Sequence, residues 1–100
     1  MITKALYVQL KAKPGKEVDV EEFLVNAQPL VDDEPGTSAW FALQEDIGVF
    51  SIFDVFADDD ARNAHLAGQV AAALMAKAPE LLLEEPVINK IDVIASKMPK

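Results

Sequence analysis

Two side chains in the middle of the chain have the chemistry to transfer a proton. His65 is the only histidine among 100 residues, and an imidazole changes its charge near neutral pH. Asp54 is the only charged residue in an apolar stretch, residues 49–57, and a carboxylate enclosed by apolar side chains is a candidate general base. His65 and Asp54 are therefore the candidate catalytic residues, and general acid–base catalysis is the chemistry that they indicate.

Each of these residues also has a simpler structural interpretation. His65 is then a partly exposed helix residue that bonds to water or to a carboxylate of the acidic run 58–60. Asp54 is then a strand residue paired with a lysine or with Arg62. The sequence leaves both alternatives open.

Aromatic, apolar and polar side chains near these two residues are candidates for binding a small ligand. Residues two apart on a strand share a face, so Phe50, Ile52 and Phe56 are expected on the same face as Asp54. An aromatic ring such as Trp40 can stack on a planar ligand or simply pack in the core, and Arg62 can hold an anion or bond to the acidic run. The candidate substrate-binding residues are Phe56, Ile52, Phe41, Tyr7, Trp40 and Arg62.

The sequence indicates neither a metal site nor a bound cofactor. The chain has no cysteine and one histidine, which excludes a thiolate site and disfavours a histidine-rich one. The three consecutive aspartates 58–60 cannot converge on one ion, and they fit the N-cap of a helix. No glycine-rich phosphate-binding pattern occurs. We therefore expect no metal site, and the residues show no pattern for binding a nucleotide cofactor.

Charge and length restrict the partners. The net charge of −8 repels a phosphate backbone, so nucleic-acid binding is not expected. No run reaches the roughly 20 apolar residues that span a bilayer, and the N-terminus lacks the apolar region of a signal peptide. We therefore expect one domain over residues 1–100, in the cytoplasm and away from membranes.

The first half of the chain predicts a strand and a helix. Residues 4–12 alternate apolar and polar side chains, which is typical of a strand with one buried face. After a Lys-Pro-Gly-Lys turn, residues 17–31 carry apolar side chains at spacings of three and four, with acids near the start. Pro29 lies inside this helix and predicts a kink, or a break and restart, near Gln28.

The middle of the chain predicts an antiparallel hairpin. Residues 37–44 and 49–57 read as strands, joined by the loop 45–48. A four-residue loop would pair Gln44 with Val49, Phe41 with Ile52, and Ala39 with Asp54.

The last third predicts a helix and a final strand. The helix begins at residues 61–67, is weakened at Gly68 and continues over 69–78, and Pro79 ends it. Residues 87–96 alternate again and read as a strand, and the tail 97–100 is expected to fray.

This order of elements is an α+β arrangement, β-α-β-β-α-β. It predicts a ferredoxin-like fold with a four-stranded antiparallel sheet and both helices on one face. The other face is left uncovered, and the sheet carries more apolar surface than a monomer usually exposes. A second copy of the chain is the simplest cover, so we expect a homodimer. The apolar residues of the sheet are Phe50, Ile52, Phe56, Phe41 and Leu43.

Three short segments, in their order and spacing, resemble those of a known protein family. KAKPGK follows the first strand, EPGT precedes the second, and AHLAG follows an aromatic strand end with an acidic cap. Together they resemble the antibiotic biosynthesis monooxygenase family, of the dimeric α+β barrel class. The resemblance implies a homodimer with a cavity between sheet and helices, and oxygenation of a small phenolic or quinol-like aromatic by molecular oxygen without flavin, metal or haem. It places His65 in the family's His-Leu motif and directs Val8 toward the cavity.

The chain also departs from the family pattern. A second histidine often follows the His-Leu motif, but this chain has Gly-Gln-Val at 68–70. The strand-end position that usually holds tryptophan is Phe56, and Val8 stands where haem-degrading members have asparagine, so haem degradation is not expected. Two other functions stay open: a dimeric small-molecule-binding or stress-response module that does no chemistry, and an isomerase on the same barrel.

Overall fold

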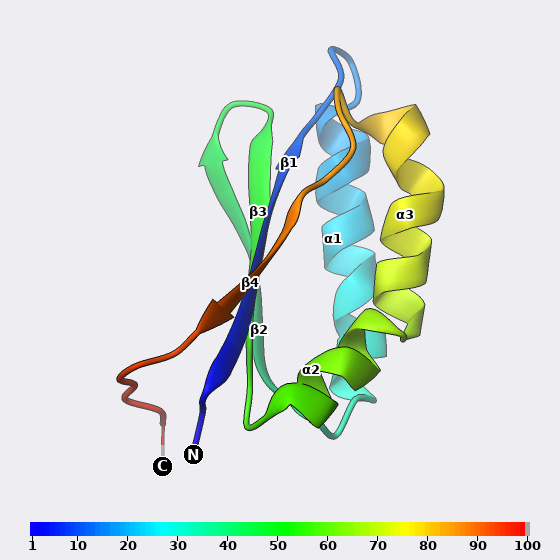
Figure 1. Cartoon of the computed structure of the whole chain (residues 1–100). Coiled ribbons are helices and arrows are strands. Elements are labelled where there is room, and N and C mark those ends of the chain that lie inside the picture. The colour runs from blue at the N-terminus through cyan, green and yellow to red at the C-terminus, as the bar shows by residue number, and fades with distance from the viewer. Residues whose placement is uncertain (100) are drawn as a thin grey trace.

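The chain forms one sheet with helices packed on one of its faces (Figure 1). The computed structural model describes residues 1–99, so the end of the predicted frayed tail, Lys100, lies outside the described residues. The elements in chain order are β1 (Lys4–Lys11), α1 (Glu17–Asp32), β2 (Thr37–Asp46), β3 (Val49–Phe56), α2 (Asp59–Leu66), α3 (Gln69–Leu81) and β4 (Ile88–Asp92).

The sheet has the predicted ferredoxin-like topology. Its four strands lie in the order β2-β3-β1-β4, and every neighbouring pair is antiparallel. In Figure 1, α1 and α3 run side by side against one face, and α2 crosses near the end of the sheet where the chain begins. The predicted α+β fold class is thus confirmed.

The predicted register of the β2–β3 hairpin is wrong. β2 extends to Asp46 and β3 begins at Val49, so the turn consists of Ile47 and Gly48 rather than four residues. Gly48 has a φ of 71°, a conformation that glycine adopts without steric cost. The register also shifts between Gln44 and Asp46, and the observed pairs are Gln44 with Phe50, Ala42 with Ile52, Phe41 with Phe53, Trp40 with Asp54, and Ala39 with Val55.

The predicted break in the first helix is also wrong. α1 continues through Pro29 to Asp32. Pro29 is exposed, so the carbonyl that loses its partner faces water rather than the core. Pro79 likewise lies inside α3, which ends at Leu81 and not before the proline. No helix within residues 1–99 has the length and apolar character needed to cross a membrane.

The single weakened helix predicted after the acidic run is two helices. The Asp58 carboxylate accepts a hydrogen bond of 2.9 Å from the Ala61 backbone, which confirms the predicted cap at the start of α2. Gly68 then separates α2 from α3, because it is the N-cap residue of α3. A Cβ at this position would lie 3.1 Å from Glu34 Oε2 and 3.2 Å from the His65 carbonyl, so the close approach favours glycine.

The final strand is shorter than predicted. β4 covers Ile88–Asp92 and pairs with the first half of β1. The segment before it follows the second half of β1, where the Leu83 amide donates to the Lys11 carbonyl at 2.9 Å. Ile94, which the sequence placed inside the strand, lies beyond it and is fully exposed.

The apolar side chains of the sheet are divided between its two faces. Phe50, Ile52 and Phe56 are buried under the helices with Asp54, as the alternation along the strand predicted. Phe41 and Leu43 lie on the opposite, open face and remain 51% and 43% exposed. The core therefore lies between the sheet and the helices, and part of the open face is apolar.

Candidate functional site

His65 lies between two carboxylates in the interior of the protein. Its Nδ1 is 2.6 Å from Glu34 Oε1, and its Nε2 is 3.0 Å from Asp54 Oδ2. The exposed fractions of the side chains are 1% for Asp54, 7% for His65 and 20% for Glu34. The three residues thus form a chain that leads from the core toward the surface.

Three separate elements position this chain. Asp54 comes from β3, His65 from the last turn of α2, and Glu34 from the loop between α1 and β2. The Thr37 hydroxyl donates to Glu34 Oε1 at 2.8 Å and fixes that carboxylate. The loop lies against α2 so closely that a Cβ on Gly36 would be 3.2 Å from the Ala61 side chain.

The two carboxylates favour the charged form of His65. Burial alone lowers the pKa of the imidazole, but the contacts with Asp54 and Glu34 outweigh burial and raise the pKa of His65 above its usual value. Nδ1 donates to Glu34, so the second imidazole proton lies on the side that faces Asp54. Phe56 packs beside the imidazole, with ring centres 5.4 Å apart and planes inclined by 42°.

The contact of His65 with Asp54 is an ion pair without the alignment of a good hydrogen bond. Neither Asp54 oxygen accepts a hydrogen bond of ordinary geometry from residues 1–99, although Nε2 is within ion-pair distance of Oδ2. A buried carboxylate with free acceptor capacity can take a proton from a ligand. Asp54 is therefore the end of the chain that is available for chemistry.

Asp54 and His65 line a small cavity between the sheet and the helices. The cavity has a volume of about 30 Å³, which is room for about one water molecule. The rest of its wall is apolar and comes from β1, β3, β4 and the two later helices. The apolar lining includes Leu6, Val8, Ile52, Leu66, Val70 and Leu74.

A larger hollow of about 250 Å³ lies on the outer side of Glu34 and is lined by Thr37 and Trp40 among others, and further hollows lie away from the site. One of about 510 Å³ lies beside the C-terminal end of α3 and is lined by Met75, Leu83 and Lys13 among others. Lys13 donates there to the Pro79 carbonyl at 2.6 Å. In Figure 1 this end of α3 is at the opposite end of the sheet from α2, so the hollow is remote from His65.

The structure brings some of the predicted binding residues to the cavity. Ile52 lines it directly, and Phe56 lies behind His65. Val8 also lines it, in the direction that the family resemblance implied. Trp40 pairs with Asp54 across the strands and packs on the core, and its indole N–H finds no acceptor in the part of the chain that the structure describes.

Two of the predicted binding residues lie on the wrong side of the sheet. Tyr7 and Phe41 are on the open face, because their positions alternate with those of the cavity-lining residues on their strands. Tyr7 donates to Glu45, a bond that raises the pKa of Tyr7 and lowers the pKa of Glu45. Neither residue can contact a ligand in the cavity beside Asp54.

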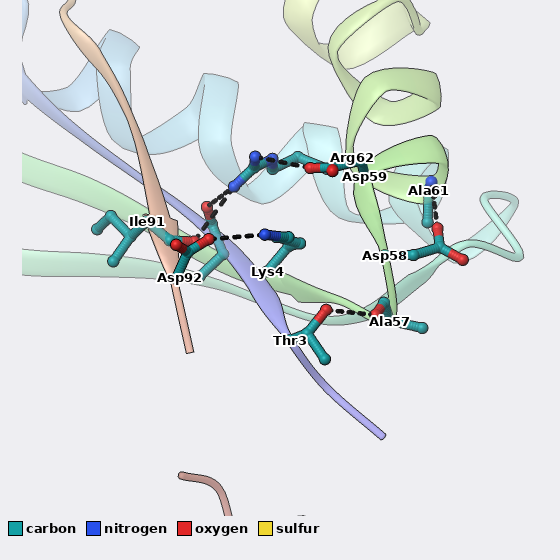
Figure 2. A network of polar contacts seen from close by, with 10 residues as sticks. Thr3, Lys4, Ala57, Asp58, Asp59, Ala61, Arg62, Ile91 and Asp92 are labelled. Atoms are coloured by element: carbon teal, nitrogen blue, oxygen red, sulfur yellow. Dashed lines mark hydrogen bonds and ion pairs between the residues drawn. The ribbon is translucent and has the colours of Figure 1, made fainter. Parts of the chain in front are cut away.

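Arg62 is held by the backbone and by its own helix. Its Nη1 donates to the carbonyls of Ala5 and Ile91, each at 3.2 Å, and its Nη2 donates to Asp59 at 3.1 Å (Figure 2). The bond to Asp59 matches the structural alternative for Arg62. Arg62 thus anchors α2 to β1 and β4, one turn before His65, and its terminal nitrogens are already engaged.

Glu34 is not among the candidate site residues that the sequence predicted. It lies in the EPGT segment, which reads as a turn, and it reaches His65 across 31 positions of the chain. The only local signal is the threonine three residues later, whose hydroxyl bonds to Glu34. The place of Glu34 in the chain of three residues comes from tertiary packing.

The chain has clear relatives among proteins of known structure. No protein-family model matches the sequence, and no curated protein is significantly similar to it. Among solved structures, the NE2512 protein of unknown function from Nitrosomonas europaea is 50% identical, with a TM-score of 0.97 over 100% of this chain and 97% of that one. The chain belongs to the NE2512 family.

The fold of the NE2512 family is also that of more distant proteins. A candidate antibiotic biosynthesis monooxygenase from Caulobacter crescentus has a TM-score of 0.79 at 22% identity, over 94% of this chain and 92% of that one. Rv0793 from Mycobacterium tuberculosis has a TM-score of 0.84 at 14% identity, over 96% and 99% of the two chains. The resemblance to the antibiotic biosynthesis monooxygenases is thus confirmed at the level of the fold.

The site of this NE2512-family member is suited to proton transfer. Within residues 1–99, no cluster of three or more histidine, cysteine or acidic side chains has the geometry to hold a metal ion. Asp54, His65 and Glu34 instead form a charged chain with one cation between two anions. Such an arrangement can take a proton from a group in the cavity and hold it.

Proposed function

We propose that the protein is a cofactor-independent monooxygenase that acts on a small phenolic or quinol-like aromatic compound. The observation that supports this most is the ion pair of Asp54 and His65 on the wall of an otherwise apolar cavity. An apolar site with one buried base fits a flat aromatic ligand that must lose its phenolic proton. The shared fold with antibiotic biosynthesis monooxygenases agrees with this choice.

The reaction balances without an added reductant. Asp54 accepts the phenolic proton, and the phenolate that forms lies beside Asp54 and His65 in the cavity. The phenolate supplies electrons to molecular oxygen, and a carbon–oxygen bond forms at the ring carbon para to the phenolic oxygen. That carbon loses its hydrogen and becomes a carbonyl. The second oxygen atom leaves as water with the two hydrogens, so a naphthol gives a naphthoquinone.

A substrate must enlarge the cavity when it binds. About 30 Å³ does not hold an aromatic ring, and ligand sites commonly measure roughly 300–1,000 Å³. The wall that can move is the junction of α2 and α3, where Leu66 and Val70 flank the break at Gly68. Outward displacement of this junction opens the cavity beside Asp54 and leaves the sheet in place.

The functional form is a homodimer in which the open faces of two sheets cover each other. Phe41 and Leu43 on β2 and Ile91 on β4 are all at least 40% exposed on this face. Exposed apolar side chains of this size, grouped on one face of a sheet, are typical of an interface. A second copy buries the same surface on both chains through a two-fold axis.

Oxygen uptake tests the proposed reaction. Purified protein free of flavin is mixed with a panel of dihydroxynaphthalenes, with a chelator present, and oxygen consumption and quinone formation are recorded. Asp54→Asn and His65→Ala should each lower the rate by about 10²-fold or more, because each removes a group of the proton-transfer pair. Asp60→Asn, an exposed acid on α2, is the matched control and should leave the rate unchanged.

Absence of turnover on every panel member would contradict the proposal. The small closed cavity favours one alternative, a module that binds a metabolite without changing it. In that case panel compounds would raise the melting temperature and be recovered chemically intact. Unchanged rates in both site variants would remove Asp54 and His65 from the mechanism.

A further inference from the structure

Glu34 has a position that the reaction above does not use. Its carboxylate is the most exposed of the three charged groups, and Asp54 at the other end is almost fully buried. The Thr37 hydroxyl holds Oε1, and Oε2 lies against the backbone of Gly68. Glu34 is thus a fixed group at the boundary between the interior and the solvent.

The distances along the chain permit proton transfer in two steps. Asp54 Oδ2 is 3.0 Å from Nε2, and Nδ1 is 2.6 Å from Glu34 Oε1. An imidazole that carries protons on both nitrogens can release one of them and later take a proton back on the same nitrogen, while the other nitrogen keeps its own. Because its two nitrogens face different carboxylates here, His65 joins an internal acceptor to an external one.

The surroundings of His65 offer no second route among residues 1–99. On β1, β3 and α3, the cavity side presents Leu6, Val8, Ile52, Val70 and Leu74, none of which titrates. On its own helix, Arg62 is the charged group one turn away, and its guanidinium is bonded to two carbonyls and to Asp59. Within the described part of the chain, residues 1–99, the charged side chains in contact with the imidazole are therefore Asp54 and Glu34.

We propose that Glu34 is the solvent-side proton acceptor and donor of the chain Asp54–His65–Glu34, which connects the cavity to water. When Asp54 takes the substrate proton, His65 releases its Nδ1 proton to Glu34, and Glu34 passes that proton to water. In the second half of the reaction Asp54 gives its proton to the oxygen atom that leaves as water. A proton then returns through Glu34 to Nδ1, so no net proton is gained or lost.

This inference rests on the proposed function only for the identity of the proton donor in the cavity. The path itself can be measured on the full chain without substrate. The imidazole protons of His65 exchange with water at a rate that nitrogen-15 NMR can follow. Because His65 is the only histidine, its signals need no assignment against others.

Glu34→Gln is the informative variant, since glutamine keeps an acceptor for Nδ1–H but cannot carry a proton away. It should slow exchange of the His65 protons by about tenfold or more, in line with the loss of a positioned acid–base group. Asp33→Asn removes a neighbouring exposed acid and should leave the rate within about twofold, the control for a change in surface charge. Equal or faster exchange in Glu34→Gln would overturn the proposal. It would mean that the Glu34 carboxylate only shields His65 from water, since a weaker contact would then let water reach the imidazole more easily.

A second variant keeps the test decisive if glutamine is not tolerated. Glu34→Ala should show slow exchange that formate restores in proportion to its concentration, because formate can occupy the space of the missing carboxylate. Exchange in Glu34→Ala that does not respond to formate would also overturn the path. If proton exchange depends on Glu34 but the protein oxidises no phenol, the proton path is supported and the monooxygenase proposal is rejected. If the protein oxidises a phenol but proton exchange does not depend on Glu34, only the proton path is rejected.

Discussion

Replacement of His65 by glutamine should destabilise the protein strongly, because it leaves the Asp54 carboxylate without a cation. Asp54 is 1% exposed, so water cannot replace the lost partner. Removal of one member of a buried ion pair costs about 3–5 kcal/mol, against a typical free energy of unfolding of about 5–15 kcal/mol. For a domain of this length the melting temperature should fall by about 12 °C or more.

The double variant His65→Gln, Asp54→Asn distinguishes lost charge pairing from lost packing. It removes both charges and leaves two amides of similar size that can bond to each other. It should therefore be more stable than His65→Gln alone, and the two substitutions should couple by about 2 kcal/mol. If the double variant lost as much free energy of unfolding as the two single variants together, the interaction between His65 and Asp54 would contribute nothing to stability.

Urea unfolding followed by circular dichroism at neutral pH provides the measurement. All proteins must be compared at one concentration, because dimerisation makes apparent stability depend on concentration. A loss below about 1 kcal/mol in His65→Gln would refute the reasoning, since exposed ion pairs contribute that little. The site would then be open to water in solution.

Three other predictions concern the pH dependence of the His65 ion pair, the hydrogen bonds of Arg62 and the open face of the sheet. The contribution of His65 to stability is the free energy of unfolding of the wild type minus that of His65→Gln. It should be fully present below the unfolded pKa of 6.5 and should be lost as pH rises through the raised pKa of the folded state. Urea unfolding curves in which this contribution increases with pH would contradict the charged state of the site. Arg62→Ala should cost about 2–3 kcal/mol in thermal unfolding because one buried and one part-buried carbonyl lose a charged donor, and Arg62→Lys should recover part of it. A loss below about 0.5 kcal/mol in Arg62→Ala would contradict the role of these bonds in anchoring α2. Phe41→Lys on the open face should shift the sedimentation equilibrium toward monomer, whereas Ile47→Lys in the hairpin turn should not, and a monomeric wild type would contradict the interface.

Local patterns in the sequence predicted the elements that carry the core. Alternation over residues 4–12 fits β1, and the acidic run supplies the Asp58 cap of α2. Period-two spacing placed Ile52, Asp54 and Phe56 on one face, which is the face under the helices. These features depend on neighbours in sequence, so the sequence was sufficient to predict them.

The errors come from packing between distant segments and from one turn. A two-residue turn and a register shift move Phe41 opposite Phe53 rather than Ile52, and a shift of one residue transfers a side chain to the other face of a sheet. Pro29 is tolerated because its side of α1 faces water. Glu34 looks like part of a turn, and only the fold of the loop onto α2 brings it to His65.

Oxygen-18 labelling tests the proposed monooxygenase most directly. Flavin-free protein is incubated under ¹⁸O₂ with 1,5-dihydroxynaphthalene, in which the carbon para to each phenolic oxygen carries a hydrogen, and the quinone product is analysed by mass spectrometry. We expect one labelled oxygen atom in each quinone and one in water for each O₂ consumed, with the rate of formation lower by about 10²-fold or more in Asp54→Asn. Quinone without the label, or labelled quinone formed equally well by Asp54→Asn, would contradict it.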